Sequence, residues 1–297
     1  KSAVLTLAVA LILAVPLAVN LLVGASERRL VARAAETPLL VGARGSTLDL
    51  VMSALYFTTD RPAPTTMVAA EEVWAGGLAD AITLYVRFQS QGVPIVGTTL
   101  DYFDFRGLEL AGGRMLAQLG EAVLGAEAAR ALGLGPGDAM ISSPENLFDI
   151  GGGYPLRMSV VGVLAPTGSP DDRVIFVDLK TAWVIEGLGH GHADPSQLSG
   201  EGMVLGRSED NVVAGAALPT FNEITPANID SFHFHGDPAA YPITGVIALP
   251  YDFRSGVILR GRYLDREQPL QILVPGDVVE RLLGSIMRVA RLLDAVV

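Results

Sequence analysis

The feature that most constrains this chain is an uncharged apolar run near its N-terminus. "AVLTLAVALILAVPLAVNLLVGA" extends from Ala3 to Ala25 without a charged side chain. A helix needs about 20 apolar residues to cross the hydrocarbon core of a bilayer. Pro16 and Asn20 lie inside the run, and membrane helices tolerate such residues where neighbouring helices supply partners. The run therefore predicts a retained membrane helix.

A cleavable signal peptide is the alternative interpretation of the same run. Val23–Ala25 has the small residues of a cleavage site, which would give a mature N-terminus near Ser26. Against this, the apolar part of a signal peptide spans only about 7–15 residues. Because the first residue is Lys1 and not Met, we also expect the chain to begin inside a longer protein.

The charges that flank the apolar run leave its orientation open. Only Lys1 precedes it, whereas Arg28, Arg29 and Arg33 follow it. A simple positive-inside count would keep the rest of the chain in the cytoplasm, but that rule weakens for long translocated domains.

Composition excludes several classes of protein. Of 297 residues, 50% are hydrophobic and 18% are charged, and the formal net charge is -11. No cationic block is present that could bind phosphates, so nucleic acid is not an expected partner. The absence of cysteine excludes disulfides and thiolate metal sites.

The pattern of elements predicts an α+β domain. Residues 38–60 ("PLLVGARGS", "LDLVMSALYF") are expected to form strands, residues 67–80 a short helix and residues 81–92 a strand. Between residues 120 and 186, an alanine-rich helix that stops at Gly133 precedes two strands and another short helix. Strands and helices alternate irregularly, which favours a mixed sheet over a regular parallel one.

The C-terminal residues carry a heptad stripe. Apolar side chains recur at spacings of three and four: Val279, Leu282, Ile286, Val289, Leu293 and Val296. This spacing is typical of an amphipathic helix that packs along a neighbour. Either the helix packs against the domain's own core, or it forms a stalk that returns to the membrane.

Two successive segments, residues 120–138 and 156–183, carry a family resemblance. "GEAVLGAEAARALGLGPGD" and "LRMSVVGVLAPTGSPDDRVIFVDLKTAW" resemble the periplasmic core domain of MacB/FtsX-type ABC transporter permeases. The resemblance is close from Gly120 to Glu186 and looser from Gly45 to Gly276. It rests mostly on packing residues and contains no catalytic signature.

The resemblance implies three parts: a membrane helix and stalk extension at residues 1–37, a MacB-like periplasmic core domain at 38–276, and a stalk helix at 277–297 that leads to a second membrane span. It places the large domain on the periplasmic side of a bacterial inner membrane, against the arginine count. It also implies a homodimer, a partner ATP-binding subunit, and a periplasmic adaptor or substrate-binding protein as a further partner.

No enzymatic activity is expected of the chain itself. The sequence has no GxxxxGK[ST] phosphate loop, so ATP hydrolysis must come from a partner. It also lacks a G-x-S-x-G elbow, an H-E-x-x-H motif and a dinucleotide fingerprint. A hydrolase that uses a histidine-bound metal, with Glu186 or Glu201 as base, is the remaining enzymatic alternative.

The four histidines fall into two copies of one pattern, H-x-H-x-D. "HGHAD" supplies His190, His192 and Asp194, and "HFHGD" supplies His233, His235 and Asp237. In an extended strand, residues i and i+2 point to the same face, so each copy can present two imidazoles to one point. The six residues are candidate ligands for zinc or copper(II), provided that the two segments meet.

Other interpretations of the histidines stay open. Both copies lie beside glycine and proline, where solvated loop histidines need no function. Neighbouring imidazoles would repel once protonated, which could make a pH sensor. An extracytoplasmic zinc-binding protein with a cleaved signal peptide is therefore the alternative to a permease subunit.

Overall fold

A computed structural model describes residues 28–58, 62–143, 155–191, 204–208, 211–214, 222–265 and 267–294, together with the single residues 14 and 24. The expected membrane helix at Ala3–Ala25 lies outside these residues except at those two positions. Among the described residues, none belongs to a helix with both the length and the hydropathy that crossing a bilayer requires.

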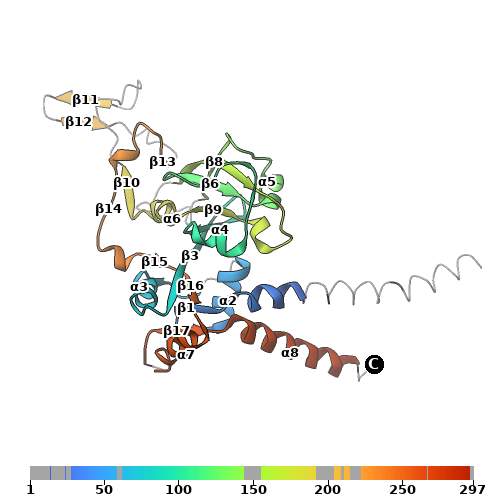
Figure 1. Ribbon diagram of the computed structural model, residues 1–297. Helices are drawn as coiled ribbons and strands as arrows, with labels where there is room; N and C mark the ends of the chain where they lie inside the picture. Colours follow the sequence, from blue (N-terminus) through green and yellow to red (C-terminus); the bar gives the residue numbers. More distant parts are fainter. Residues whose placement is uncertain are drawn as a thin grey trace, which may run out of the picture.

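Most of the described strands belong to one sheet. They are β1 (Leu39–Ala43), β3 (Ala79–Ser90), β4 (Val93–Thr98), β5 (Leu110–Gly113), β6 (Glu121–Leu124), β7 (Ala139–Ile141), β8 (Leu156–Leu164), β9 (Ile175–Asp178), β13 (Asn222–Glu223), β16 (Gly245–Pro250) and β17 (Leu270–Leu273). Their order is β13-β8-β6-β9-β4-β3-β16-β1-β17, and β5 and β7 also pair with β8 (Figure 1).

The sheet is mixed, as predicted for an α+β domain. Strand β4 runs parallel to β9, and β8 runs parallel to β6 and β13. The pairs that β3 and β1 make with their neighbours are antiparallel.

Helices cover both faces of this sheet. They are α2 (Thr47–Tyr56), α3 (Val68–Ala75), α4 (Asp101–Arg106), α5 (Ala126–Leu132), α6 (Leu179–Glu186), α7 (Phe253–Gly261) and α8 (Pro275–Asp294), preceded by a helix at residues 28–35. Alternate residues of β9 serve the two faces: Ile175 and Val177 face a core with α3, α6 and α7, whereas Phe176 faces a core with α2, α4 and the base of α8.

The prediction of a strand within "LDLVMSALYF" is wrong, because residues 47–56 form helix α2. The Ser46 side chain accepts a hydrogen bond from the Asp49 backbone N–H at 3.2 Å and so caps the helix. Phe57 ends the helix in the left-handed region, at φ 56°. The buried residues Leu50, Val51, Ala54 and Leu55 share one helical face.

Most other predicted elements are confirmed. Helix α5 ends at Gly133, whose φ of 66° is the left-handed conformation that favours glycine.

The predicted C-terminal helix is also present as α8, which includes the heptad positions from Val279 to Leu293. Val296, the last position of the stripe, lies outside the described residues.

Among the described residues, three small pairs of strands lie outside the main sheet. Strand β10 (Gly189–Gly191) pairs with β14 (Phe232–Phe234), and β11 (Val204–Ser208) pairs with β12 (Asn211–Ala214). Strand β2 (Thr65–Thr66) pairs with β15 (Pro242–Ile243). The β10–β14 ribbon matters most here because it carries His190 and His233.

Candidate functional site

The β10–β14 ribbon places two histidines opposite each other. Strand β10 begins directly after α6, which ends at Gly187 in the left-handed conformation. The two strands are antiparallel, and His190 lies opposite His233 in their register. Directly opposed residues have their side chains on the same face of a ribbon, so the pairing brings the two imidazoles together.

The residues beside these histidines explain the register. Gly189 pairs with Phe234 and Gly191 pairs with Phe232. A Cβ atom on either glycine would lie 2.6 Å from a ring carbon of its phenylalanine, so only glycine lets the rings lie across the ribbon. Both phenylalanines pack against the core. One face of the ribbon is therefore fixed by packing, and the other presents the histidines.

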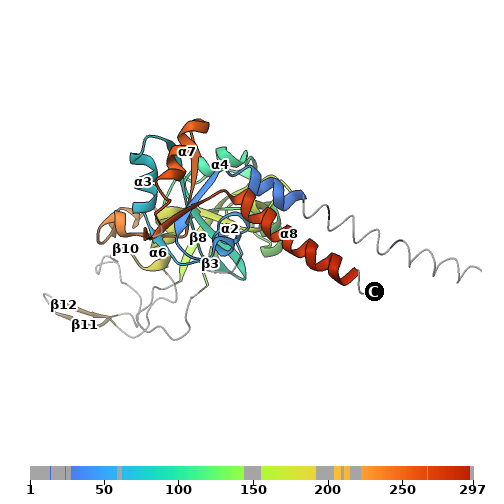
Figure 2. The same cartoon turned by 90° about the horizontal axis from the view of Figure 1, so that it is seen from below.

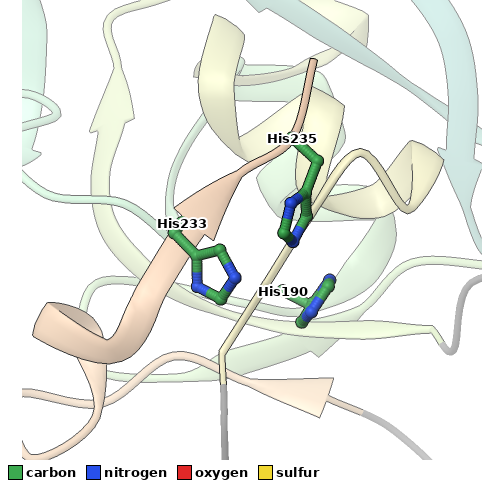
Figure 3. Close-up of side chains that lie close together, drawn as sticks. All are labelled: His190, His233 and His235. Atoms are coloured by element: carbon green, nitrogen blue, oxygen red, sulfur yellow. The ribbon is translucent and has the colours of Figure 1, made fainter.

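A third imidazole joins this pair. His235 follows β14, where its backbone N–H donates to the Leu188 carbonyl and its own carbonyl accepts from the Tyr241 hydroxyl at 3.0 Å. Ring centroids lie 4.9 Å apart for His190 and His233, 4.9 Å for His190 and His235, and 4.6 Å for His233 and His235 (Figure 3). Each ring offers a nitrogen within 4.8 Å of a nitrogen of both others.

A backbone hydrogen bond orients one of the rings. The Nδ1 atom of His233 lies 3.0 Å from the carbonyl oxygen of Ser231. Since a carbonyl can only accept, neutral His233 carries its proton on Nδ1, which places the ring's lone pair on Nε2. His233 is half-buried, whereas His190 and His235 are exposed.

The other predicted ligands are His192, Asp194 and Asp237. His192 and Asp194 are outside the described residues. Asp237 is exposed, and its carboxylate accepts from the backbone N–H of Ala239 at 3.0 Å, which caps the short 3-10 helix η4 (Pro238–Ala240). Among the described residues, the group of metal-ligating side chains at this ribbon consists of His190, His233 and His235.

Glu186, one of the two candidate bases, makes polar contacts with strand β3. Its carboxylate accepts from the Tyr85 hydroxyl at 2.8 Å and pairs with Arg87 at 3.3 Å. Glu201, the other candidate base, lies outside the described residues.

A second cluster, which the sequence did not reveal, joins the helix at residues 28–35 to the domain. The Arg33 guanidinium donates to both carboxylate oxygens of Asp171, at 2.6 and 3.0 Å, and to the Tyr102 hydroxyl at 2.8 Å. The hydroxyl in turn donates to Asp171 at 2.7 Å. The Arg33 Nε–H donates to the Leu55 carbonyl. Arg33, Tyr102 and Asp171 are at most 6% exposed.

Electrostatics keep this buried pair charged. Burial alone would raise the pKa of Asp171, but the Arg33 guanidinium and the hydrogen bonds from Arg33, Tyr102 and Ser169 outweigh it and lower the pKa. Burial raises the pKa of the Tyr102 hydroxyl, so it stays protonated as a donor. The cluster is thus an ion pair with its hydrogen bonds satisfied.

The fold and these clusters define an α+β domain with no catalytic constellation among its described residues, and sequence comparison assigns its family. The profile of the MacB-like periplasmic core domain matches residues 2–217. The chain belongs to this family, whose members are the periplasmic core domains of ABC transporter permeases. No curated protein matches the chain.

Solved structures of low sequence identity are also similar. The periplasmic region of MacB from Actinobacillus actinomycetemcomitans is 12% identical with a TM-score of 0.45, and the match covers 84% of this chain and 94% of that one. The extracellular domain of the transporter YknZ from Gram-positive bacteria is 11% identical with a TM-score of 0.41, covering 79% and 98%. A domain of a putative permease protein from Porphyromonas gingivalis is 11% identical with a TM-score of 0.34, covering 80% and 88%.

Proposed function

We propose that the chain is part of the permease subunit of a MacB/FtsX-type ABC transporter. It supplies the first membrane helix at residues 1–37, the extracytoplasmic domain at 38–276 and a stalk helix at 277–297. The subunit couples ATP hydrolysis by a partner ATP-binding subunit to a change in the extracytoplasmic domain, for export or envelope transport. Membership of the family is the observation that carries this proposal.

The arrangement of the two ends of the domain supports it. The helix at residues 28–35 and α8 extend from the same side of the domain (Figures 1 and 2). At their base, Ala34 packs in one core with Val278 and Val279, and Leu283 packs against that core. Because both helices extend from the same side of the domain, they could act as two stalks that connect it to one membrane.

The cluster of Arg33, Tyr102 and Asp171 would hold the helix at residues 28–35 rigidly against the domain. Arg33 lies on the helix that follows the apolar run, while Asp171 and Tyr102 belong to the domain. Separating a buried ion pair leaves uncompensated charges in a poorly solvated site, which opposes independent movement of helix and domain. A displacement of the membrane helix would thus be passed on to the domain.

The printed sequence contains no phosphate loop, and we propose that a partner ATP-binding subunit supplies the hydrolysis. We further propose a homodimer in the inner membrane, with the large domain on the periplasmic side and an adaptor or substrate-binding protein as a further partner.

Purification of the full-length protein under mild detergent tests this proposal. We expect an ATP-binding subunit to co-purify with it. In a separate measurement of transport and ATP hydrolysis, Arg33→Ala should uncouple the two. Arg28→Ala, a change of an exposed arginine on the same helix, should leave coupling intact. A mature N-terminus near Ser26, with no ATP-binding partner, would instead favour a secreted zinc-binding protein.

A further inference from the structure

The three clustered histidines are not explained by packing. The opposite face of the ribbon provides the apolar contacts, through Phe232 and Phe234. On the histidine face, His190 and His235 are exposed, so apolar burial does not hold their rings together. We propose that His190, His233 and His235 form a binding site for a divalent transition metal, with Zn²⁺ as the ion of best fit.

The spacing of the ring nitrogens is close to the spacing that a bound zinc ion would require. In a tetrahedral zinc site with Zn–N bonds of about 2.0–2.1 Å, ligand nitrogens lie about 3.3 Å apart. Nitrogens of the three rings already lie within 4.8 Å of one another. His190 and His235 are exposed, and small rotations of their side chains would close the remaining gap.

The hydrogen bond from His233 to Ser231 supports the same assignment. Metal-ligating histidines usually donate their second ring N–H to a carbonyl or carboxylate, which fixes the ring and makes the ligand nitrogen more basic. The Nδ1 atom of His233 makes such a contact, 3.0 Å from the Ser231 carbonyl oxygen. The lone pair of the ring then lies on Nε2, the nitrogen that would coordinate the ion.

The ligand set selects the class of metal. Three neutral imidazoles suit zinc and copper(II), whereas calcium and magnesium prefer oxygen ligands. Three histidines also leave a fourth position on a tetrahedral ion for water or an external donor. The proposed ion would join β10 to β14, two strands from distant parts of the sequence, and would fasten their ribbon beside the end of α6.

Zinc titration of the full-length protein in detergent, after removal of metal with a chelator, tests the site. We expect one Zn²⁺ per chain, with Cu²⁺ competing and Mg²⁺ and Ca²⁺ without effect at the same concentration. Each of His190→Ala, His233→Ala and His235→Ala should weaken zinc binding at least about 10-fold, because loss even of outer-shell partners costs about 10–100-fold. Zinc should also raise the melting temperature of the wild type but not that of the triple variant.

Two controls separate metal loss from misfolding. The variants should melt at the wild-type temperature in the presence of chelator, and Asp237→Asn, a change outside the cluster, should bind zinc as tightly as the wild type. Undiminished binding by the triple variant, or magnesium binding in place of zinc, would overturn the proposal. Either result would leave the proposed permease role untouched, because that role does not depend on the histidines.

Discussion

At the scale of single residues, we expect the loss of the buried contact between Arg33 and Asp171 to lower the free energy of unfolding most. The two residues are 138 positions apart in the chain, and each is nearly inaccessible to water. Removing one member of such a pair leaves a buried charge without compensation, which typically costs more than the pair itself contributes.

Arg33→Ala should therefore lower the free energy of unfolding by about 3–5 kcal/mol. Denaturant titration of the purified protein measures this, with Arg28→Ala as the matched control that should stay within about 0.5 kcal/mol of the wild type. The double variant Arg33→Met/Asp171→Leu should recover most of the loss, since it removes both charges. Equal stabilities for the double variant and Arg33→Ala would contradict the account.

The same pair predicts a dependence of stability on pH. Because the pKa of Asp171 is lowered in the folded state, its contribution is complete above the ordinary pKa of an aspartate, near 3.9, and is lost as the pH falls through the folded value. Wild-type unfolding free energy should thus fall more steeply than that of Asp171→Asn below about pH 4. Asp104→Asn, which changes an exposed carboxylate, should keep the wild-type slope; parallel curves for all three proteins would refute the assignment.

At the scale of secondary-structure elements, Gly125, the residue before α5, is required by close backbone packing. It lies in the first of the two segments that resemble the MacB-like family. A Cβ atom at Gly125 would lie 2.2 Å from the Asp171 carbonyl oxygen and 2.5 Å from the Asp172 backbone. The 3-10 helix η1 (Pro170–Arg173) therefore approaches α5 through its backbone, next to the carboxylate that holds Arg33.

Gly125→Ala should destabilise the protein by about 1–3 kcal/mol, because main-chain atoms cannot move aside as a flexible side chain can. Gly112→Ala, at a position where an added Cβ meets nothing within 4 Å, should change the stability by less than about 0.5 kcal/mol. Thermal unfolding of both variants provides the comparison. A wild-type melting temperature for Gly125→Ala would show that η1 can withdraw from α5.

Local sequence signals predicted many elements and failed at one instructive place. The strand–helix order after residue 120 was readable because Gly133 and the β-branched run of β8 are strong local signals. Helix α2 was missed because its apolar residues also suit a strand, although Ser46 and Asp49 formed a visible capping pair.

Long-range contacts set the limit of prediction for the sites. The repeated H-x-H pattern indicated which histidines to consider, but the register that pairs His190 with His233 depends on glycines facing phenylalanines across two distant strands. Arg33 was interpreted only as a flanking charge, because no local pattern links it to Asp171.

At the scale of the whole molecule, the central claim is that the domain stands outside the cytoplasm on a membrane helix that is retained. The helix at residues 28–35 packs beside the base of α8, with Ala35 in van der Waals distance of a Cβ placed on Gly276. Both helices extend from one side of the domain, which is the side we expect to face the membrane (Figure 2).

One labelling measurement tests this claim most directly. The printed sequence has no cysteine, and Phe253 is 89% exposed, so Phe253→Cys adds an accessible thiol to the domain. Intact spheroplasts are treated with a membrane-impermeant maleimide and their membranes are then washed with alkaline carbonate. We predict that the full-length protein is labelled and stays in the pellet. Labelled protein released by the wash, or protein labelled only after lysis, would contradict the account.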